Sequence, residues 1–218
     1  MYKLYGAKNV ASFTPHICLI KTEADFEFIQ VDMYNKEHLG EEYLSLNPNG
    51  RIPVLIDNTV KDEPLVLYET AAISLHIADH HPQANLLPPL RSDARSHAYK
   101  WLMYFTNTIQ TYLLVYYYAD RYTSDSKSIP ANQAAMEKHI STAFNIVAEE
   151  LKDKRSFLLG DTPYLIDYFL LMLSDWAHEF KIQNGPLSHG ALKNYLERVK
   201  VLPEVQAALK EEGFSPSF

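Results

Sequence analysis

Two short stretches of this chain carry residue types that could bind a charged peptide. The first reads NPNGRIPVLID and spans Asn47 to Asp57, with a turn over Asn47–Gly50 and an apolar strand over Val54–Ile56. Proline cannot donate to a strand ladder, so Pro53 marks a bend or an edge at the strand entrance. The main chain of Ile52 is therefore left to pair with something other than its own sheet.

The second stretch, YETAAI from Tyr68 to Ile73, follows a predicted strand over Leu65–Leu67 and opens a helix at Glu69. It places an acid, the hydroxyl of Thr70 and the N–H groups of a helix start together. Such a start is an anion site with a carboxylate beside it. A peptide that carries both a carboxylate and an ammonium group at one end fits this arrangement.

The composition limits the classes of protein to consider. The chain has 218 residues, 47% hydrophobic and 22% charged, which is long enough for one large or two small domains. A net charge of −7, with the acids spread along the chain, argues against a nucleic-acid surface. One cysteine, Cys18, allows no intrachain disulfide and indicates a reducing compartment, and its position predicts a small core residue. Tyr164 to Trp176 is too short and too charged to span a bilayer, so no membrane partner is expected.

The elements that must position these residues follow from spacing. The first eighty residues predict the order β-α-β, an irregular helix, then β-β-α, in which Thr14 caps a helix starting at Pro15. The proline-rich stretch 81–90 predicts a linker, with His80-His81 as a solvated pair. The nine histidines show no metal-ligand spacing such as HExxH, so no metal is expected.

After the linker only helical periodicity remains. Asp93 to Tyr122 predicts about 45 Å of helix with a bend or break. Ala134–Leu151 and the apolar Pro163–Phe180 predict two further helices, the second of them central. Two short helices, Leu192–Val201 and Pro203–Glu211, are expected to close the bundle.

Together, GRIPVL and YETAAI resemble the glutathione-binding half of the glutathione transferases, and the resemblance extends over essentially the whole chain, closest to the bacterial beta-like group. It implies a thioredoxin-like α/β domain over residues 1–80, a linker over 81–90 and an all-α domain over 91–218. It also implies a cytoplasmic homodimer that uses glutathione as co-substrate.

The resemblance assigns a role to each residue of the two stretches. Ile52, before a cis Pro53, would hold the cysteinyl backbone of glutathione as an added strand. The hydroxyl and N–H of Thr70 would take the γ-glutamyl carboxylate, and Glu69 would face its ammonium group. Lys36 would meet the glycine carboxylate, with Arg51 and Lys8 as alternatives.

A glutathione transferase must stabilise a thiolate, because the thiolate is the nucleophile. The beta-like group commonly reads Gly-Ala-Cys-Ser before Pro-His; here the loop is Asn9–Ser12 before Thr14-Pro15-His16, and Ala11 stands at the cysteine position. Ser12 is the predicted catalytic residue. Asn9, Tyr5 or a backbone N–H are alternatives for the sulfur contact, and a capping role in the loop is the structural alternative for Ser12.

The electrophile is expected between the domains, against the first long helix. A histidine that often faces the sulfur from this helix is replaced here by Gln110. The candidate lining residues are Tyr104, Asn107, Thr108, Thr111 and Tyr112.

The sequence therefore predicts conjugation of glutathione to a small hydrophobic electrophile, a reaction of detoxification. A non-catalytic relative that keeps the fold for binding, and a glutathione-dependent disulfide reductase, remain alternatives because the cysteine and histidine counterparts are absent. A further prediction concerns Asp167 in GDTPYLID, which should accept backbone N–H bonds in the first turn of the central helix.

Overall fold

The computed structural model describes residues 1–60, 63–178 and 188–216, and these form two compact units. The first unit holds Met1–Leu87 together with Leu202–Ser215, and the second holds Pro88–Val201. The predicted division at residues 81–90 lies at the first of these boundaries. The last helix was expected in the helical domain, but it packs in the first unit.

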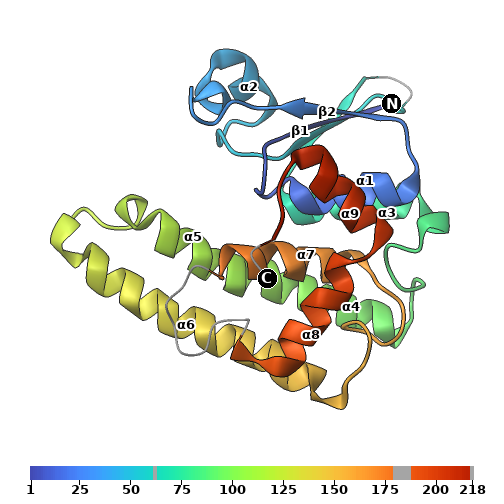
Figure 1. The fold of residues 1–218 in the computed structure, drawn as a ribbon. Helices are drawn as coiled ribbons and strands as arrows, with labels where there is room; N and C mark the ends of the chain where they lie inside the picture. The colour runs from blue at the N-terminus through green and yellow to red at the C-terminus, as the bar shows by residue number, and fades with distance from the viewer. Residues whose placement is uncertain (61–62, 179–187, 217–218) are drawn as a thin grey trace. The chain divides into compact units, whose positions relative to one another are not determined.

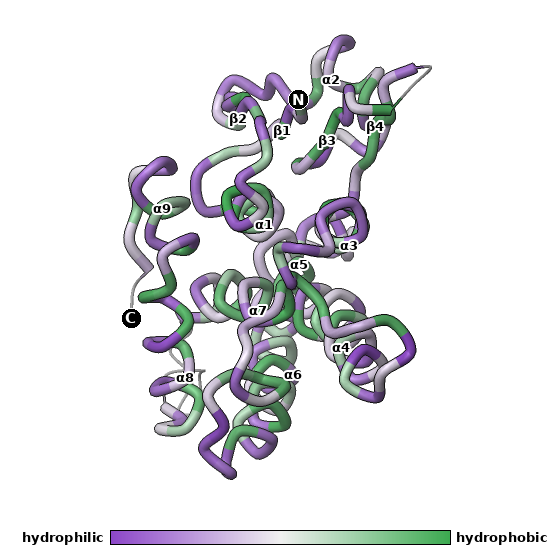
Figure 2. The backbone as a smooth tube through the Cα atoms, turned by 90° about the vertical axis from the view of Figure 1, so that its right-hand side faces the viewer, coloured by the Kyte–Doolittle hydropathy of each residue, from purple (hydrophilic) through white to green (hydrophobic). Residues whose placement is uncertain are grey.

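The first unit is built on one four-stranded sheet (Figure 1). Its strands are β1 (Tyr2–Gly6), β2 (Phe26–Gln30), β3 (Val54–Asp57) and β4 (Leu65–Tyr68), in the spatial order β2-β1-β3-β4. β2 runs parallel to β1, and β3 runs antiparallel to both β1 and β4. The predicted hairpin of β3 and β4 is confirmed, although residues 61–62 of its turn lie outside the described residues. The hydropathy colouring shows β3 and β4 as apolar strands (Figure 2).

The helices of the first unit differ from prediction at their ends. They are α1 (Phe13–Thr22), α2 (Glu41–Leu46), α3 (Thr70–His80) and α9 (Pro203–Glu212), with 3-10 turns η1 (Glu37–Leu39) and η2 (Pro82–Ala84). Because α1 starts at Phe13, its N-cap is Ser12 and not Thr14. Because α3 runs on to His80, that histidine ends a helix and does not belong to the linker.

The core of the first unit joins the sheet to α1 and α3. Leu4 from β1, Val54 and Leu55 from β3, Ile17 from α1 and Ile73 from α3 are all fully buried. Cys18 is also fully buried, which confirms the prediction of a core residue, and burial raises the pKa of its thiol. A thiol held in its protonated form is a poor nucleophile.

The described residues of the second unit form helices joined by turns and loops, with one isolated bridge between Phe157 and Gly160. Its longer helices are α4 (Asp93–Tyr104), α5 (Thr111–Tyr117), α6 (Ile129–Glu150), α7 (Leu165–Trp176) and α8 (Gly190–Lys200). Three 3-10 turns connect them: η4 (Ala119–Arg121), η5 (Ser126–Ser128) and η6 (Leu151–Asp153).

The predicted break in the first long helix is confirmed. A π-helical segment, η3 (Phe105–Gln110), separates α4 from α5. Such wide turns shift the hydrogen-bond ladder, and the hydroxyl of Thr111 donates to the Thr106 carbonyl at 3.2 Å within this region.

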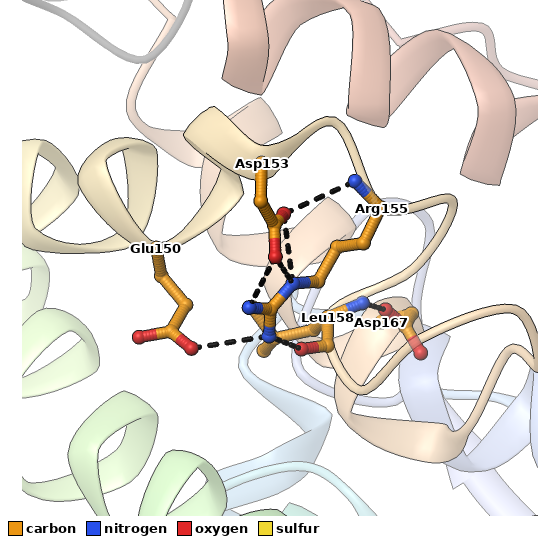
Figure 3. A network of polar contacts seen from close by, with 5 residues as sticks. All are labelled: Glu150, Asp153, Arg155, Leu158 and Asp167. Carbon is orange, nitrogen blue, oxygen red and sulfur yellow. Dashed lines mark hydrogen bonds and ion pairs between the residues drawn. The ribbon is translucent and has the colours of Figure 1, made fainter.

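Helix α7 is the central element of the second unit, and its first eleven residues are buried. It ends at Trp176, whereas the predicted end, Phe180, lies outside the described residues. Asp167 accepts the N–H of the N-cap residue Tyr164 at 2.7 Å, as predicted, and also the N–H of Leu158 at 2.9 Å. Leu158 connects Asp167 to Arg155, because the Arg155 guanidinium donates to the Leu158 carbonyl at 3.1 Å (Figure 3).

None of the helices in the described part of the chain is long and apolar enough to cross a bilayer.

Candidate functional site

The first candidate element is the turn that precedes β3. The side chain of Asn47 is buried and donates to the Arg51 carbonyl at 2.7 Å, while the backbone carbonyl of Asn47 accepts the N–H of Gly50 at 2.9 Å. Gly50 has φ +57°, a left-handed conformation in which glycine is favoured over other residues. The Tyr43 hydroxyl also donates to the Arg51 carbonyl, at 2.9 Å. This turn therefore fixes the chain from both sides just before Ile52.

The structure places Ile52 and Pro53 beyond the sheet ladder. The peptide bond between them is cis, as expected. Val54 is the first residue of β3, and it pairs with Tyr5 of β1 and Tyr68 of β4. The main chain of Ile52 thus lies outside the strand pairing, in a position where an extended peptide could align with it.

The second candidate element is the start of α3. Glu69 is the N-cap residue, with φ +76° and ψ +115°, and its side chain is exposed and makes no cap hydrogen bond. A glutamate with positive φ is uncommon, and such conformations gather at functional sites. The exposed carboxylate therefore stands beside the N–H groups of the first turn of an eleven-residue helix.

The Thr70 hydroxyl is used differently from the prediction. Thr70 is 5% exposed, and its hydroxyl donates to the Ala11 carbonyl at 3.0 Å. A carboxylate ligand needs a donor, and this hydrogen is already engaged. The role of the hydroxyl toward a carboxylate therefore stays a prediction, and the main-chain N–H groups at Thr70 are further candidate donors.

The same hydrogen bond brings the two ends of the candidate site together. Ala11 belongs to the loop that precedes α1, and Thr70 opens α3, fifty-nine residues later. The starts of two helices are therefore adjacent, and each presents the positive end of its dipole. A ligand with negative charge at its sulfur and at its carboxylate would be stabilised at both starts.

Ser12, the predicted catalytic residue, has no exposed surface. Its hydroxyl donates to the Ala7 carbonyl at 3.1 Å and accepts the Ala7 N–H at 3.2 Å. The hydroxyl makes no cap hydrogen bond to α1 and bonds to the Ala7 backbone instead, so it fixes the loop between Ala7 and Ser12. The catalytic role of Ser12 stays a prediction. Gly6 supports this close packing, because a Cβ on it would lie 2.5 Å from the Cβ and Oγ of Ser12.

Sequence reasoning missed the contribution of α9 to this loop. Glu212 accepts the Asn9 N–H at 3.0 Å and pairs with His16 Nδ1 at 2.9 Å. His16 is 1% exposed, and its Nε2 pairs with Glu211 at 2.9 Å. Lys8, an alternative for the glycine carboxylate, donates instead to the Gly213 carbonyl at 2.6 Å.

These contacts hold the loop before α1 in place through residues 211–213, at the end of α9. The only local hints are the acidic pair at residues 211–212 and the lone histidine after Pro15, and neither hint specifies its partner.

The remaining predicted ligands of glutathione are in exposed positions. Lys36 is an exposed residue with φ +60° in the loop after β2, at the N-cap of η1. Arg51 is exposed in the turn before Ile52. Tyr5 packs edge-on against Tyr43 at 6.1 Å between ring centroids, which agrees with a packing residue of β1.

The predicted electrophile residues lie around the π-helical segment of the second unit. The Tyr104 hydroxyl points to the Ala143 carbonyl of α6, at 3.4 Å. Burial, with Tyr112 nearby, raises the pKa of Tyr104. Tyr112 stacks on His139 of α6 at 5.2 Å. Both tyrosines therefore pack against α6. The other candidates of this set differ in burial: Thr108 is half-buried, and Asn107 and Thr111 are exposed.

Potential metal ligands occur elsewhere in the first unit, where Asp57, His76 and His80 come together.

Comparison with known proteins finds similarity to glutathione S-transferases. Residues 1–79 match the model of the glutathione S-transferase N-terminal domain. Glutathione S-transferase GstA of Escherichia coli is 29% identical over 212 residues, covering 97% of this chain and 98% of the relative. A sphingomonad glutathione S-transferase solved in complex with glutathione has a TM-score of 0.80 at 28% identity, covering 98% of this chain and 100% of its own.

A third relative matches the predicted subgroup. The bacterial beta class glutathione S-transferase of Sphingomonas chungbukensis has a TM-score of 0.81 at 26% identity, covering 98% of this chain and all of its own. The chain thus carries a glutathione S-transferase N-terminal domain over residues 1–79, followed by a helical unit, and it is similar to glutathione S-transferases along its full length.

Proposed function

We propose that this protein is a glutathione transferase that joins the glutathione thiolate to a small hydrophobic electrophile. The observation that carries the proposal is the hydrogen bond from Thr70 to Ala11, which brings the start of α3 beside the loop before α1. Relatives similar along the full chain are named glutathione S-transferases, and one was solved with glutathione.

Glutathione would lie along the first unit in an extended conformation. Its cysteinyl backbone would pair with the main chain of Ile52, outside the ladder that ends at Val54. Its γ-glutamyl carboxylate would meet the N–H groups at the start of α3, and its ammonium group would face the exposed carboxylate of Glu69. Lys36, exposed in the loop after β2, would meet the glycine carboxylate.

The sulfur would then sit at the start of α1. Ser12 is tied to the Ala7 backbone, so we assign the sulfur contact to the main-chain N–H groups of Ala11 and Ser12 and to the positive end of α1. Both favour the thiolate over the thiol and so lower the pKa of the bound sulfur. Ser12 acts as a positioning residue that sets the shape of the loop.

The electrophile would bind the helix that runs through α4, η3 and α5. Tyr104, Thr108, Thr111 and Tyr112 remain the proposed lining residues. Tyrosine side chains combine an apolar ring with a polar hydroxyl, which suits a small hydrophobic molecule that carries a polar leaving group.

The protein would act in detoxification as a cytoplasmic homodimer. Support for a dimer comes from apolar surface: on the edge strand β4, Leu65, Val66 and Tyr68 are 37–38% exposed, and on α4 Tyr99 and Met103 are 40% and 46% exposed. Exposed apolar residues on an edge strand favour association. Light scattering after gel filtration measures the oligomeric state directly.

Glutathione binding by isothermal titration calorimetry tests the proposal, with Glu69→Gln as the site variant. Loss of one charge-assisted contact at about 1.5 kcal/mol should weaken binding about tenfold. Glu42→Gln, at another exposed glutamate of the first unit, is the matched control and should bind like the wild type. A folded wild type that does not bind glutathione, or equal affinity in Glu69→Gln, would contradict the proposed site.

Conjugation is measured separately, with a chlorodinitrobenzene and several other electrophiles. Turnover should require glutathione and should fall in Glu69→Gln when glutathione is below its dissociation constant. Binding without conjugation of any electrophile would instead support the non-catalytic alternative, and reduction of a mixed disulfide by glutathione would support the reductase alternative.

A further inference from the structure

Three potential metal ligands lie together in the first unit, at the end of β3 and on the second half of α3. They lie away from the turn before β3 and the start of α3, which are proposed to bind glutathione. Asp57, His76 and His80 each offer one ligand atom, and these atoms all lie within 4.8 Å of one another. Asp57 ends β3 and has no exposed surface, His76 is half-buried on α3, and His80 is exposed at the end of α3. Burial thus decreases from Asp57 through His76 to His80, and the cluster is open to solvent at His80.

The spacing of the two histidines follows from helix geometry. His76 and His80 are four residues apart on α3, so their side chains lie one above the other on one face of the helix. Their ring centroids are 4.0 Å apart. This is the histidine spacing of HExxH, by which a helix supplies two ligands to one zinc ion, so the expectation that no histidines have metal-ligand spacing was wrong.

The outer contacts of the cluster orient its ligand atoms. His80 Nδ1 lies 2.9 Å from the His76 carbonyl, which accepts a hydrogen from it and leaves the lone pair on Nε2. Asp57 Oδ1 accepts the N–H and the hydroxyl of Thr59 at 2.8 and 2.7 Å, so Oδ2 is the oxygen that faces His76, at 2.8 Å. Metal-bound histidines and carboxylates usually have such partners on their second atom.

The adjacent His81 is engaged elsewhere, because its Nε2 lies 3.0 Å from the Tyr2 hydroxyl.

We propose that Asp57, His76 and His80 bind one zinc ion, with solvent completing its coordination. One carboxylate and two imidazoles form a ligand set that suits zinc and other borderline divalent ions. Two ligands about 2.1 Å from one ion lie roughly 3.0 to 3.5 Å apart, so the pair at 2.8 Å needs to open by only about half an ångström.

The bound ion takes the place of the hydrogen between His76 and Asp57, and the His76 ring then carries its hydrogen on Nδ1 instead of Nε2. The ion would join the end of β3 to the end of α3.

His80 distinguishes this proposal from an ordinary ion pair. The contact of Asp57 with His76 alone would serve to fasten α3 to the sheet, and that function does not need His80. A metal site does need it. Substitution of His80 therefore removes the metal site and leaves the Asp57–His76 pair intact.

The experiment measures metal binding by the untagged full chain. Equilibrium dialysis with Zn²⁺ should give one bound ion per chain, and Co²⁺ should give a visible absorption band typical of imidazole and carboxylate ligands. His80→Ala should weaken zinc binding at least tenfold and abolish the cobalt band. His97→Ala, at an exposed histidine of the second unit, should bind like the wild type.

Thermal unfolding gives a second readout. Zinc should raise the Tm of the wild type and of His97→Ala but not that of His80→Ala, because only a native-state site stabilises the fold. Absence of stoichiometric binding to the wild type, or equal zinc affinity in His80→Ala, would overturn the proposal. Because His80 is exposed, circular dichroism should show an unchanged fold in the variant.

Discussion

The buried carboxylate of Asp167 offers a strong test of the packing in the helical unit. It accepts three hydrogen bonds: from the Leu158 N–H at 2.9 Å, the Tyr164 N–H at 2.7 Å and the Tyr195 hydroxyl at 2.5 Å. Asp167 and Tyr195 have no exposed surface. The variant Asp167→Ala removes the common acceptor and leaves three donors without a partner.

The expected loss follows from these contacts. Each buried donor left unsatisfied costs about 1–3 kcal/mol, and removing a buried charge returns part of that sum. We expect Asp167→Ala to lower the free energy of unfolding by about 3–5 kcal/mol. Tyr195→Phe removes one donor and leaves the other two bonds in place, so its cost should be about 1–2 kcal/mol.

Urea denaturation followed by tryptophan fluorescence is the appropriate assay. The chain has two tryptophans, Trp101 and Trp176, and both lie in the second unit with Asp167. The signal therefore reports the unfolding of that unit. A loss below about 1 kcal/mol for Asp167→Ala, or an equal loss for Tyr195→Phe, would refute the reasoning.

The pH dependence provides an internal check. Burial raises the pKa of Asp167 to about 6, despite its three hydrogen bonds, whereas the unfolded value is about 3.9. Between these values the folded state binds more protons, so the Asp167 contribution to stability grows as pH falls. From pH 7.5 to pH 5 the wild type should gain about 1.4 kcal/mol relative to Asp167→Asn, which cannot titrate. A constant difference between the two proteins would show that the folded pKa is not raised.

Two further substitutions probe the loop before α1 by thermal unfolding. Gly6→Ala should destabilise by about 1–3 kcal/mol, because its Cβ would lie 2.5 Å from the Cβ and Oγ of Ser12; an unchanged Tm would mean that this contact relaxes at no cost. His16→Leu should cost about 2–4 kcal/mol, because the buried carboxylate of Glu212 loses its imidazole partner and keeps only the Asn9 N–H, whereas Lys152→Met in an exposed ion pair should cost less than about 0.5 kcal/mol. Equal Tm values for these last two variants would argue against the anchoring of α9.

Much of the candidate site is encoded locally in the sequence. The turn before Ile52 is set by two hydrogen bonds of Asn47, one to the N–H of Gly50 and one to the carbonyl of Arg51, both within four residues along the chain. The Asp167 bond to the Tyr164 N–H spans three residues. Such contacts can be predicted because turn and capping preferences depend on near neighbours.

The details of side-chain use were decided by the tertiary structure. The sequence identifies Ser12 and Thr70 as hydroxyls near helix starts, but it does not reveal that their hydrogens go to the carbonyls of Ala7 and Ala11. A hydroxyl can donate in many directions, and the acceptor is chosen by the backbone that packs against it.

Local patterns along the chain are enough to predict the thioredoxin-like order of strands and helices, the helical second half and the two glutathione stretches. Packing in three dimensions is needed to place α9 against α1, where His16 pairs with Glu212 across 196 residues, and to bring Asp57 beside His76 and His80. Periodicity and capping predict a helix or strand, because its formation depends on residues that are close together along the chain. Which elements then touch depends on how their apolar faces pack, and no local pattern specifies that.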